Sequence, residues 1–205
     1  MKIIGLTGAS GAGKGTVAKI MSEKFGALHI DTDLTARKVV MKGKPCLEEL
    51  KNAFGSGIIK KSGSLDRKKL ASIAFSDKEN RKKLNKITHF YINAEVKKII
   101  EKAKKSGKTE YIVIDAPLLF ESGEDKLCDV TLGIVSDKET RKKRIIKRDK
   151  IKALSAEKRI NAGKKDGYYG KKCDYVLENR GETLEEFESK AEKFLEKMFS
   201  EISGK

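Results

Sequence analysis

A glycine-rich segment near the N-terminus has the residue types that bind phosphate. It reads Gly8-Ala9-Ser10-Gly11-Ala12-Gly13-Lys14-Gly15-Thr16. Glycines let the backbone curl so that successive N–H groups point at one anion, and a lysine at this place can follow a γ-phosphate during its transfer. We interpret residues 8–16 as a phosphate-binding loop (P-loop) for ATP, with expected contacts from Gly8, Ser10, Gly11, Ala12, Gly13, Lys14, Gly15 and Thr16.

The residues on either side of this segment support the interpretation. The apolar run 2–7 has the length of a strand, and Val17, Ala18, Ile20 and Met21 recur at helical spacing. A strand, a glycine loop and a helix start are the context that a P-loop requires, and the positive end of the helix dipole faces the same anion. A glycine-rich turn that binds nothing is the alternative, and the flanking elements argue against it.

Two residues are candidates for contact with Mg²⁺. The position after the P-loop lysine, usually Ser or Thr, is Gly15, so a loop hydroxyl appears only at Thr16. Residues 111–114 predict a strand that ends at Asp115, and an acid at such a place often helps to hold Mg²⁺ through water. A plain strand-end carboxylate is an equal alternative for Asp115, because its position alone does not decide.

A second strand, predicted at 27–30, ends in Asp31-Thr32-Asp33. Parallel strands joined by helices present their carboxyl ends along one edge, where ligands bind. We expect Asp33 to act as base toward a hydroxyl acceptor, with Asp31 as helper and Arg37 on a phosphate of the acceptor. The alternative is that these carboxylates cap the next helix, expected near Leu34, and one can cap while the other acts.

Residues 139–149 predict a helix dense in positive charge, on which Arg144 and Arg148 share one face. Forked guanidinium groups suit the charge on a transferring phosphoryl group. An ordinary basic surface helix is the alternative. A further helix is expected to begin at Ser155 as its N-cap, so residues 140–170 resemble a basic lid that closes over ATP.

Further strands are predicted at 129–135 and 174–178, and Thr183 is expected to cap a final helix that packs against the sheet. Residues 116–121 are expected to leave the sheet as an apolar loop. The pattern predicts one α/β domain over 1–205, with a core at about 1–40, 111–138 and 173–205. A mainly helical substrate lobe is expected at about 41–110 and a lid at about 139–172. In the lobe, His89 is interpreted as a packed histidine, with ligand contact as the alternative.

Composition narrows the function classes. The chain has 205 residues and a net charge of +16, which attracts anions generally. No apolar run approaches the roughly 20 residues of a membrane span, and the three cysteines form no C-x-x-C pair, so we expect a cytoplasmic protein. Aromatic residues make up only 6%, without the interleaved stacking residues of single-strand binders, so nucleic acid is not expected as the main partner.

Beyond these patterns, the chain resembles the dephospho-coenzyme A kinase family, whose members catalyse the last step of coenzyme A synthesis. Matching pieces occur in the family's order over nearly the whole chain. They are Gly5-Leu6-Thr7-Gly8 leading into the P-loop, Asp31-Thr32-Asp33-Leu34-Thr35-Ala36-Arg37, Gly63-Ser64-Leu65-Asp66-Arg67 followed by Leu70, Pro117-Leu118-Leu119-Phe120-Glu121, Arg144 with Arg148-Asp149, and Cys173-Asp174-Tyr175-Val176-Leu177-Glu178-Asn179.

The resemblance implies a five-stranded parallel sheet flanked by helices and transfer of the ATP γ-phosphate, with Mg²⁺, to the ribose 3′-hydroxyl of dephospho-CoA. It implies that Lys14, Asp33 and Arg144 are catalytic residues and that Arg148 binds ATP. Candidate acceptor contacts are Asp31, Arg37, His89, Pro117 and Leu118.

The chain departs from the family pattern at three places. Gly15 stands where the family has Ser, His89-Phe90 where it has His-Pro, and Arg141 where glutamine is common. The alternative functions are a nucleoside or nucleoside-monophosphate kinase and, from another class, a basic nucleic-acid-binding NTPase. We expect a monomer that binds small-molecule substrates and no membrane.

Overall fold

The computed structural model describes residues 1–181 and 183–204. The chain forms two compact units: the first comprises residues 1–30 and the chain from Ser106 onward, and the second is Asp31–Lys105. Across the described residues, no helix is both long enough and apolar enough to cross a membrane.

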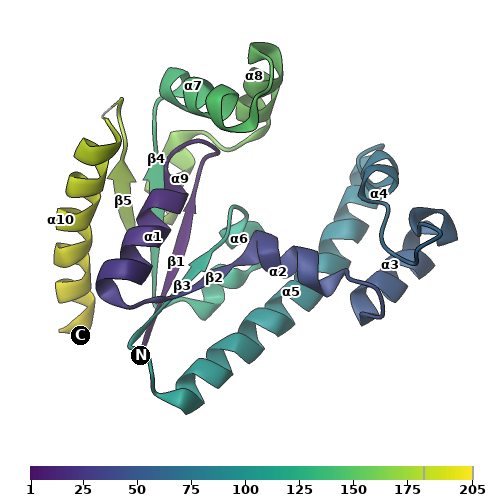
Figure 1. Cartoon of the computed structure of the whole chain (residues 1–205), viewed down its shortest axis with the longest axis horizontal. Coiled ribbons are helices and arrows are strands. Elements are labelled where there is room, and N and C mark those ends of the chain that lie inside the picture. Colours follow the sequence, from purple (N-terminus) through teal and green to yellow (C-terminus); the bar gives the residue numbers. More distant parts are fainter. Residues whose placement is uncertain (182, 205) are drawn as a thin grey trace. The chain divides into compact units, whose positions relative to one another are not determined.

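The first unit is built on a five-stranded sheet of order β2-β3-β1-β4-β5 (Figure 1). The strands are β1 (Lys2–Gly8), β2 (Leu28–Asp31), β3 (Tyr111–Asp115), β4 (Val130–Val135) and β5 (Tyr175–Glu178). β1 lies at the centre and pairs in parallel with β3 and β4, and β4 pairs in parallel with β5. Near-continuous apolar runs are typical of parallel strands buried on both faces, which is why these segments were recognisable. The predicted α/β fold is confirmed.

Two helices that are far apart in sequence pack together beside the sheet. α1 (Lys14–Phe25) begins at the P-loop lysine, and α10 (Leu184–Ser203) is the last helix of the described residues. α10 begins with a capping box, in which Thr183 accepts from the Glu186 N–H and the Glu186 side chain accepts from the Thr183 N–H. Its apolar stripe enters the core, where Phe199 stacks on Phe25 with ring centroids 4.5 Å apart. The prediction that this helix packs on the sheet is confirmed.

The segment after β3 differs from the prediction. Residues 116–121 were expected to form a loop, but α6 (Leu119–Ser122) begins within them, and the short 3-10 helix η2 (Glu124–Leu127) follows. The reason is packing: Leu119 is fully buried, and its side chain lies against Gly5 of β1. Pro117 and Leu118 remain exposed beside the end of β3.

Three helices connect β4 to β5: α7 (Lys138–Asp149), α8 (Ala153–Ala162) and α9 (Asp166–Lys172). The prediction that Ser155 caps α8 is wrong, because the N-cap is Lys152 and Ser155 lies inside the first turn. A helix that begins earlier carries Ala156 and Ile160 onto Ile145 of α7, where the three form a small apolar core of their own.

The second unit is mainly helical, as predicted for this part of the chain. It contains α2 (Thr32–Val39), α3 (Pro45–Phe54), the 3-10 helix η1 (Ser56–Ile58), α4 (Arg67–Ala74) and nearly all of α5 (Lys78–Ser106). Glycines at positive φ separate its first helices: Gly43 at 81°, Gly55 at 86° and Gly63 at 81°. α5 continues through His89-Phe90 without interruption, as expected where no proline removes a backbone N–H.

Candidate functional site

The P-loop has a backbone that curls as its glycines predict. Gly8, Gly11 and Gly13 have backbone φ angles of 149°, 81° and 112°, values that residues with a side chain rarely adopt. Lys14 opens α1, and its Nζ donates to the Gly8 carbonyl at 3.0 Å, so the ammonium group folds back over the loop. The loop thereby curls around the expected phosphate position, and the first turn of α1 begins at the same place.

Close packing explains two of these glycines further. A Cβ built on Gly13 would lie 2.6 Å from Asn179 Nδ2 and 3.0 Å from a ring carbon of Phe187. A Cβ on Gly11 would lie 2.9 Å from the Arg141 carbonyl oxygen. The loop therefore rests directly on α7 and on the segment that follows β5, and a side chain at either glycine would push them away.

Gly15 is different. It is exposed in the first turn of α1, and a Cβ built on it would meet no heavy atom within 4 Å among the described residues. The departure from the usual serine is thus not enforced by packing. Thr16, the next residue, is only partly buried.

Arg144 is held beside the P-loop by a residue that sequence reasoning did not select. Its Nη2 donates to Asn179 Oδ1 at 2.8 Å, and Asn179 Nδ2 donates to the Ala12 carbonyl at 2.9 Å. The other terminal nitrogen, Nη1, is buried and has no hydrogen-bond partner in the described part of the chain. A buried guanidinium nitrogen without a protein acceptor is suited to an anion such as a phosphate.

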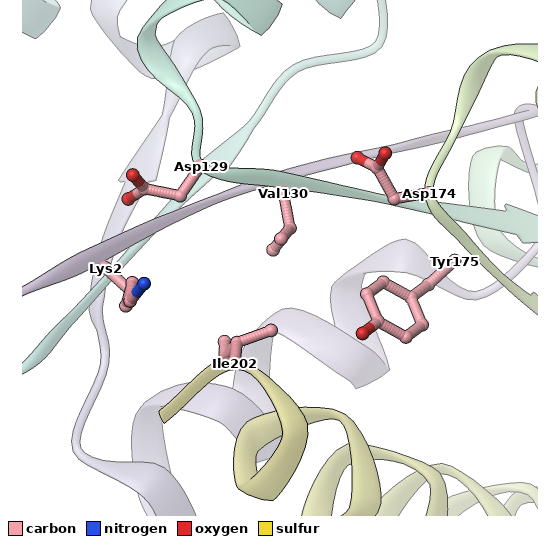
Figure 2. A pocket seen from close by; sticks show the side chains of 6 residues that line it. All are labelled: Lys2, Asp129, Val130, Asp174, Tyr175 and Ile202. Carbon is pink, nitrogen blue, oxygen red and sulfur yellow. The ribbon is translucent and has the colours of Figure 1, made fainter. Parts of the chain in front are cut away.

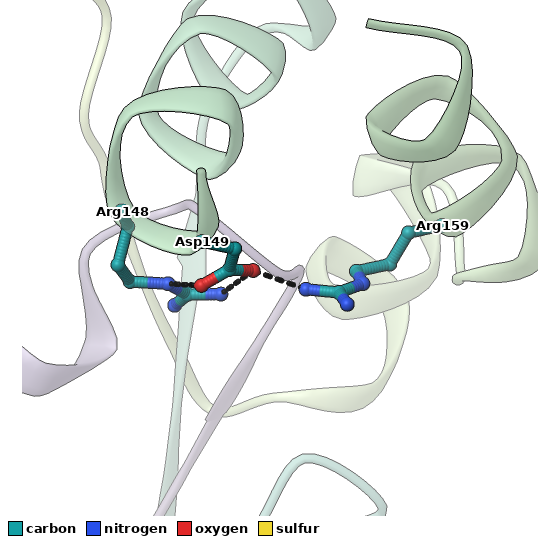
Figure 3. A network of polar contacts seen from close by, with 3 residues as sticks. All are labelled: Arg148, Asp149 and Arg159. Carbon is teal, nitrogen blue, oxygen red and sulfur yellow. Dashed lines mark hydrogen bonds and ion pairs between the residues drawn. The ribbon is translucent and has the colours of Figure 1, made fainter. Parts of the chain in front are cut away.

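Arg148, four residues further along α7, has a protein partner. Its Nε and Nη2 donate to the two oxygens of Asp149, at 2.7 Å and 3.0 Å, and Arg159 of α8 also donates to Asp149 (Figure 3). The hydrogen bonds between these two side chains lower the pKa of Asp149 and raise the pKa of Arg148. Asp149 thus joins α7 to α8, and contact of Arg148 with ATP stays a prediction.

Arg141, where the family commonly has glutamine, is buried at the start of α7. Its Nε donates to the Ser136 carbonyl at 2.9 Å, so the side chain fixes the turn between β4 and α7. This is the turn of α7 that lies on Gly11 of the P-loop.

Asp115 ends β3, as predicted. It lies 3.6 Å from His29 Nε2, an ion pair whenever that histidine is protonated. Its side chain is only 16% exposed. Within residues 1–181 and 183–204, no group of three or more His, Cys, Asp or Glu side chains could hold a metal ion. Any Mg²⁺ here would depend on few protein ligands, the usual situation where phosphates and water complete the shell.

Three of the candidate acceptor residues, Asp31, Arg37 and His89, and the proposed base Asp33 belong to the second unit, whereas Pro117 and Leu118 belong to the first. Asp31 is the N-cap of α2, and its Oδ1 accepts from the Leu34 N–H at 2.9 Å. Asp33 and Arg37 are exposed on α2, and His89 lies in α5. A pocket of about 270 Å³ within this unit combines three lysines with the largely exposed ring of Phe90; its lining residues are Lys38, Val39, Lys44, Pro45, Phe90, Tyr91, Ala94, Glu95 and Lys98.

A larger pocket of about 500 Å³ lies at the amino ends of β1, β4 and β5 (Figure 2). Its two carboxylates have structural partners: Asp129 accepts from the Ile3 N–H at 2.6 Å, and Asp174 accepts from the Thr131 N–H at 2.8 Å. The P-loop follows the carboxyl end of β1, so this pocket is separate from the phosphate site.

Comparison with known proteins agrees with this geometry. The family model described as dephospho-CoA kinase matches residues 2–185. A dephospho-CoA kinase of Fusobacterium nucleatum is 44% identical over 95% of this chain and 97% of its own. A crystal structure from Thermus thermophilus superimposes with a TM-score of 0.81 at 28% identity, covering 98% of this chain and 97% of that one. A dephospho-CoA kinase from Campylobacter jejuni gives a TM-score of 0.69 at 28% identity, with 96% of each chain covered. The chain therefore belongs to the dephospho-CoA kinase family.

Proposed function

We propose that this chain transfers the γ-phosphate of ATP to the ribose 3′-hydroxyl of dephospho-CoA, the reaction of its family, through the residues assembled around its P-loop. The observation that carries the proposal is the pairing of two cationic groups at one loop. Lys14 folds over the Gly8 carbonyl, and Arg144 Nη1 is buried without a protein acceptor in the described residues. Phosphoryl transfer depends mostly on positioning and on neutralising charge, and these groups supply both.

Asp33 is proposed as the base that orients the acceptor hydroxyl and takes its proton late in the transfer. Support comes from its neighbour: Asp31 accepts from the backbone of α2 and so acts as a cap. Asp33, the second residue of α2, is not the N-cap, and its side chain is exposed. Asp31 retains its second oxygen for the helper role that the sequence suggests.

Mg²⁺ is proposed to bind beside the P-loop, where it would neutralise charge on the β- and γ-phosphates. Thr16 and Asp115 fit this group as oxygen donors, one with a loop hydroxyl and the other at the end of the strand next to β1. Neither of these two oxygen donors depends on a hydroxyl side chain at position 15.

The helical unit is proposed to hold the acceptor through Arg37 and His89, with Pro117 and Leu118 contributing from the segment after β3. Lys38, Lys44 and Lys98 beside the Phe90 ring offer the two features that a phosphorylated adenosine requires, cations and a stacking surface. The domain boundaries given from the sequence, the monomeric state and the cytoplasmic location stay predictions.

The test is incubation with ATP and a panel of acceptors, with ADP release and phosphorylated product both measured. Dephospho-CoA is expected to be phosphorylated and nucleosides or nucleoside monophosphates to be left unchanged. Phosphorylation of a monophosphate with dephospho-CoA ignored would decide for the first alternative. ATP hydrolysis stimulated by RNA or DNA, with a steep salt dependence of binding, would decide for the second.

A Lys14→Ala variant tests the P-loop itself. Turnover is expected to be abolished, since the variant lacks the ammonium group that folds over the loop at the Gly8 carbonyl. Lys19→Ala, a change at an exposed lysine of the same helix, is the matched control and should keep full activity. An active Lys14→Ala enzyme would refute the assignment.

A further inference from the structure

Asn179 joins three segments that are distant in sequence. It follows β5, and its backbone N–H donates to the Val135 carbonyl at the end of β4, at 2.9 Å. Its side-chain amide then donates to the P-loop at Ala12 and accepts from Arg144 of α7, at 2.9 Å and 2.8 Å. The residue is only 2% exposed, so both bonds are shielded from water.

An amide is the side chain that this position requires, since one end must donate and the other must accept. A carboxylate could satisfy Arg144 but would repel the Ala12 carbonyl. An aliphatic side chain would leave both a buried carbonyl and a buried guanidinium nitrogen without a partner, which is costly. Gly13 completes the arrangement, because any Cβ there would collide with Asn179 Nδ2.

The consequence concerns Arg144. A guanidinium group is planar and rigid, so fixing Nη2 also fixes the direction of Nη1. That Nη1 is the buried nitrogen without an acceptor in the described residues. We propose that Asn179 is a positioning residue: it ties Arg144 to the P-loop so that Nη1 points at the phosphate that the loop holds. This inference rests on the proposed role of Arg144.

The role can be separated from a merely structural one by a double-mutant cycle on Asn179 and Arg144 in the full-length enzyme. If Asn179 acts through Arg144, Asn179→Ala should lower kcat by about 10–100-fold, with a much smaller change in the Kd for ATP. In the Arg144→Ala background the same change should alter kcat by less than about 2-fold, because the group it positions is gone. Single-turnover kinetics measures the slow variants.

Two more variants complete the design. Asn179→Asp is nearly isosteric and should fold; it is expected to lose kcat as well, because its carboxylate would pair with Arg144 and neutralise it. Asn161→Ala changes an exposed asparagine of α8 and should leave kcat and the melting temperature unchanged.

The possible outcomes differ in what they overturn. Full kcat in both Asn179 variants, or losses that multiply independently in the Arg144→Ala background, would overturn the positioning role alone. Full kcat in Arg144→Ala would overturn the proposed role of Arg144 and the inference with it. Absence of dephospho-CoA phosphorylation by the unchanged enzyme would instead overturn the proposed function.

Discussion

Two glycines of the P-loop, two positions apart, should respond in opposite ways to the same substitution. Gly13 has a φ of 112°, and a Cβ on it would lie 2.6 Å from Asn179 Nδ2. Alanine at left-handed φ costs about 1–2 kcal/mol. Displacing Asn179 would strip partners from the buried Ala12 carbonyl and from Arg144, at about 1–3 kcal/mol for a group left unsatisfied. Gly13→Ala should therefore lower the free energy of unfolding by about 2–5 kcal/mol.

Gly15→Ala is the matched control. A Cβ there meets nothing within 4 Å, and the residue lies in the first turn of a helix. Alanine is a better helix former than glycine by up to about 1 kcal/mol, so this variant should be as stable as the parent or more so.

Urea unfolding followed by circular dichroism measures both variants, with the m-value checked for equal exposure of surface. Close packing at Gly13 is contradicted if Gly13→Ala unfolds at the parent's urea concentration, or if Gly15→Ala loses as much stability as Gly13→Ala.

Three further predictions concern the proposed base Asp33, the buried thiols, and the link between α7 and α8. Asp33→Asn should lower kcat by about 10²–10⁴-fold while the Kd for ATP stays near the parent value, and equal losses in both would refute Asp33 as base. Burial raises the thiol pKa of Cys46 and Cys173 to about 11 and that of Cys128 to about 12, so these thiols should stay neutral and react slowly with a disulfide reagent at pH 8 until the protein is unfolded. Rapid labelling of the native protein would contradict this slow reaction. Because the folded-state thiol pKa values are raised, the free energy of unfolding should also fall as the pH rises above the ordinary thiol pKa of 9.0. Asp149→Asn should speed hydrogen exchange in α8, because it removes the carboxylate shared by Arg148 and Arg159. Since the folded-state pKa of Asp149 is lowered, the link should be lost in the parent as the pH falls below about 4, with the same effect on exchange. Unchanged exchange in both cases would contradict the link between α7 and α8.

The sequence predicted the parts of the site whose signals are local. Glycines followed by a lysine between a strand and a helix identify a P-loop, because the phosphate cradle is made from one continuous stretch of backbone. The strand that ends at Asp115 was equally visible, since a parallel strand buried on both faces reads as an apolar run. The capping box at Thr183 is a local pattern as well.

Asn179 could not be selected in the same way. It was visible as the last residue of a family motif, but its role comes from Ala12 and Arg144, which reach it from distant parts of the chain. Nothing in residues 173–181 indicates which carbonyl an asparagine there would meet. The one available signal was its type, an amide placed directly after a buried strand.

The two errors have a common cause. Ser155 is a good N-cap by propensity, yet α8 begins earlier because Ala156 and Ile160 pack on Ile145. Residues 116–121 were expected to form a loop, yet Leu119 is buried beside Gly5 and a helical turn forms. In both places, tertiary packing outweighed a local preference of small energy.

Two proposals remain to be tested together: that Lys14 and Arg144 hold the γ-phosphate of ATP on the P-loop, and that Asp33 receives the acceptor hydroxyl. A crystal structure of the enzyme with a non-hydrolysable ATP analogue and dephospho-CoA tests both most directly. We expect the γ-phosphate to lie within hydrogen-bond distance of Lys14 and Arg144 Nη1, and the ribose 3′-hydroxyl to lie within hydrogen-bond distance of the Asp33 carboxylate. A complex in which that hydroxyl faces another group, with Asp33 turned to solvent, would contradict the second proposal.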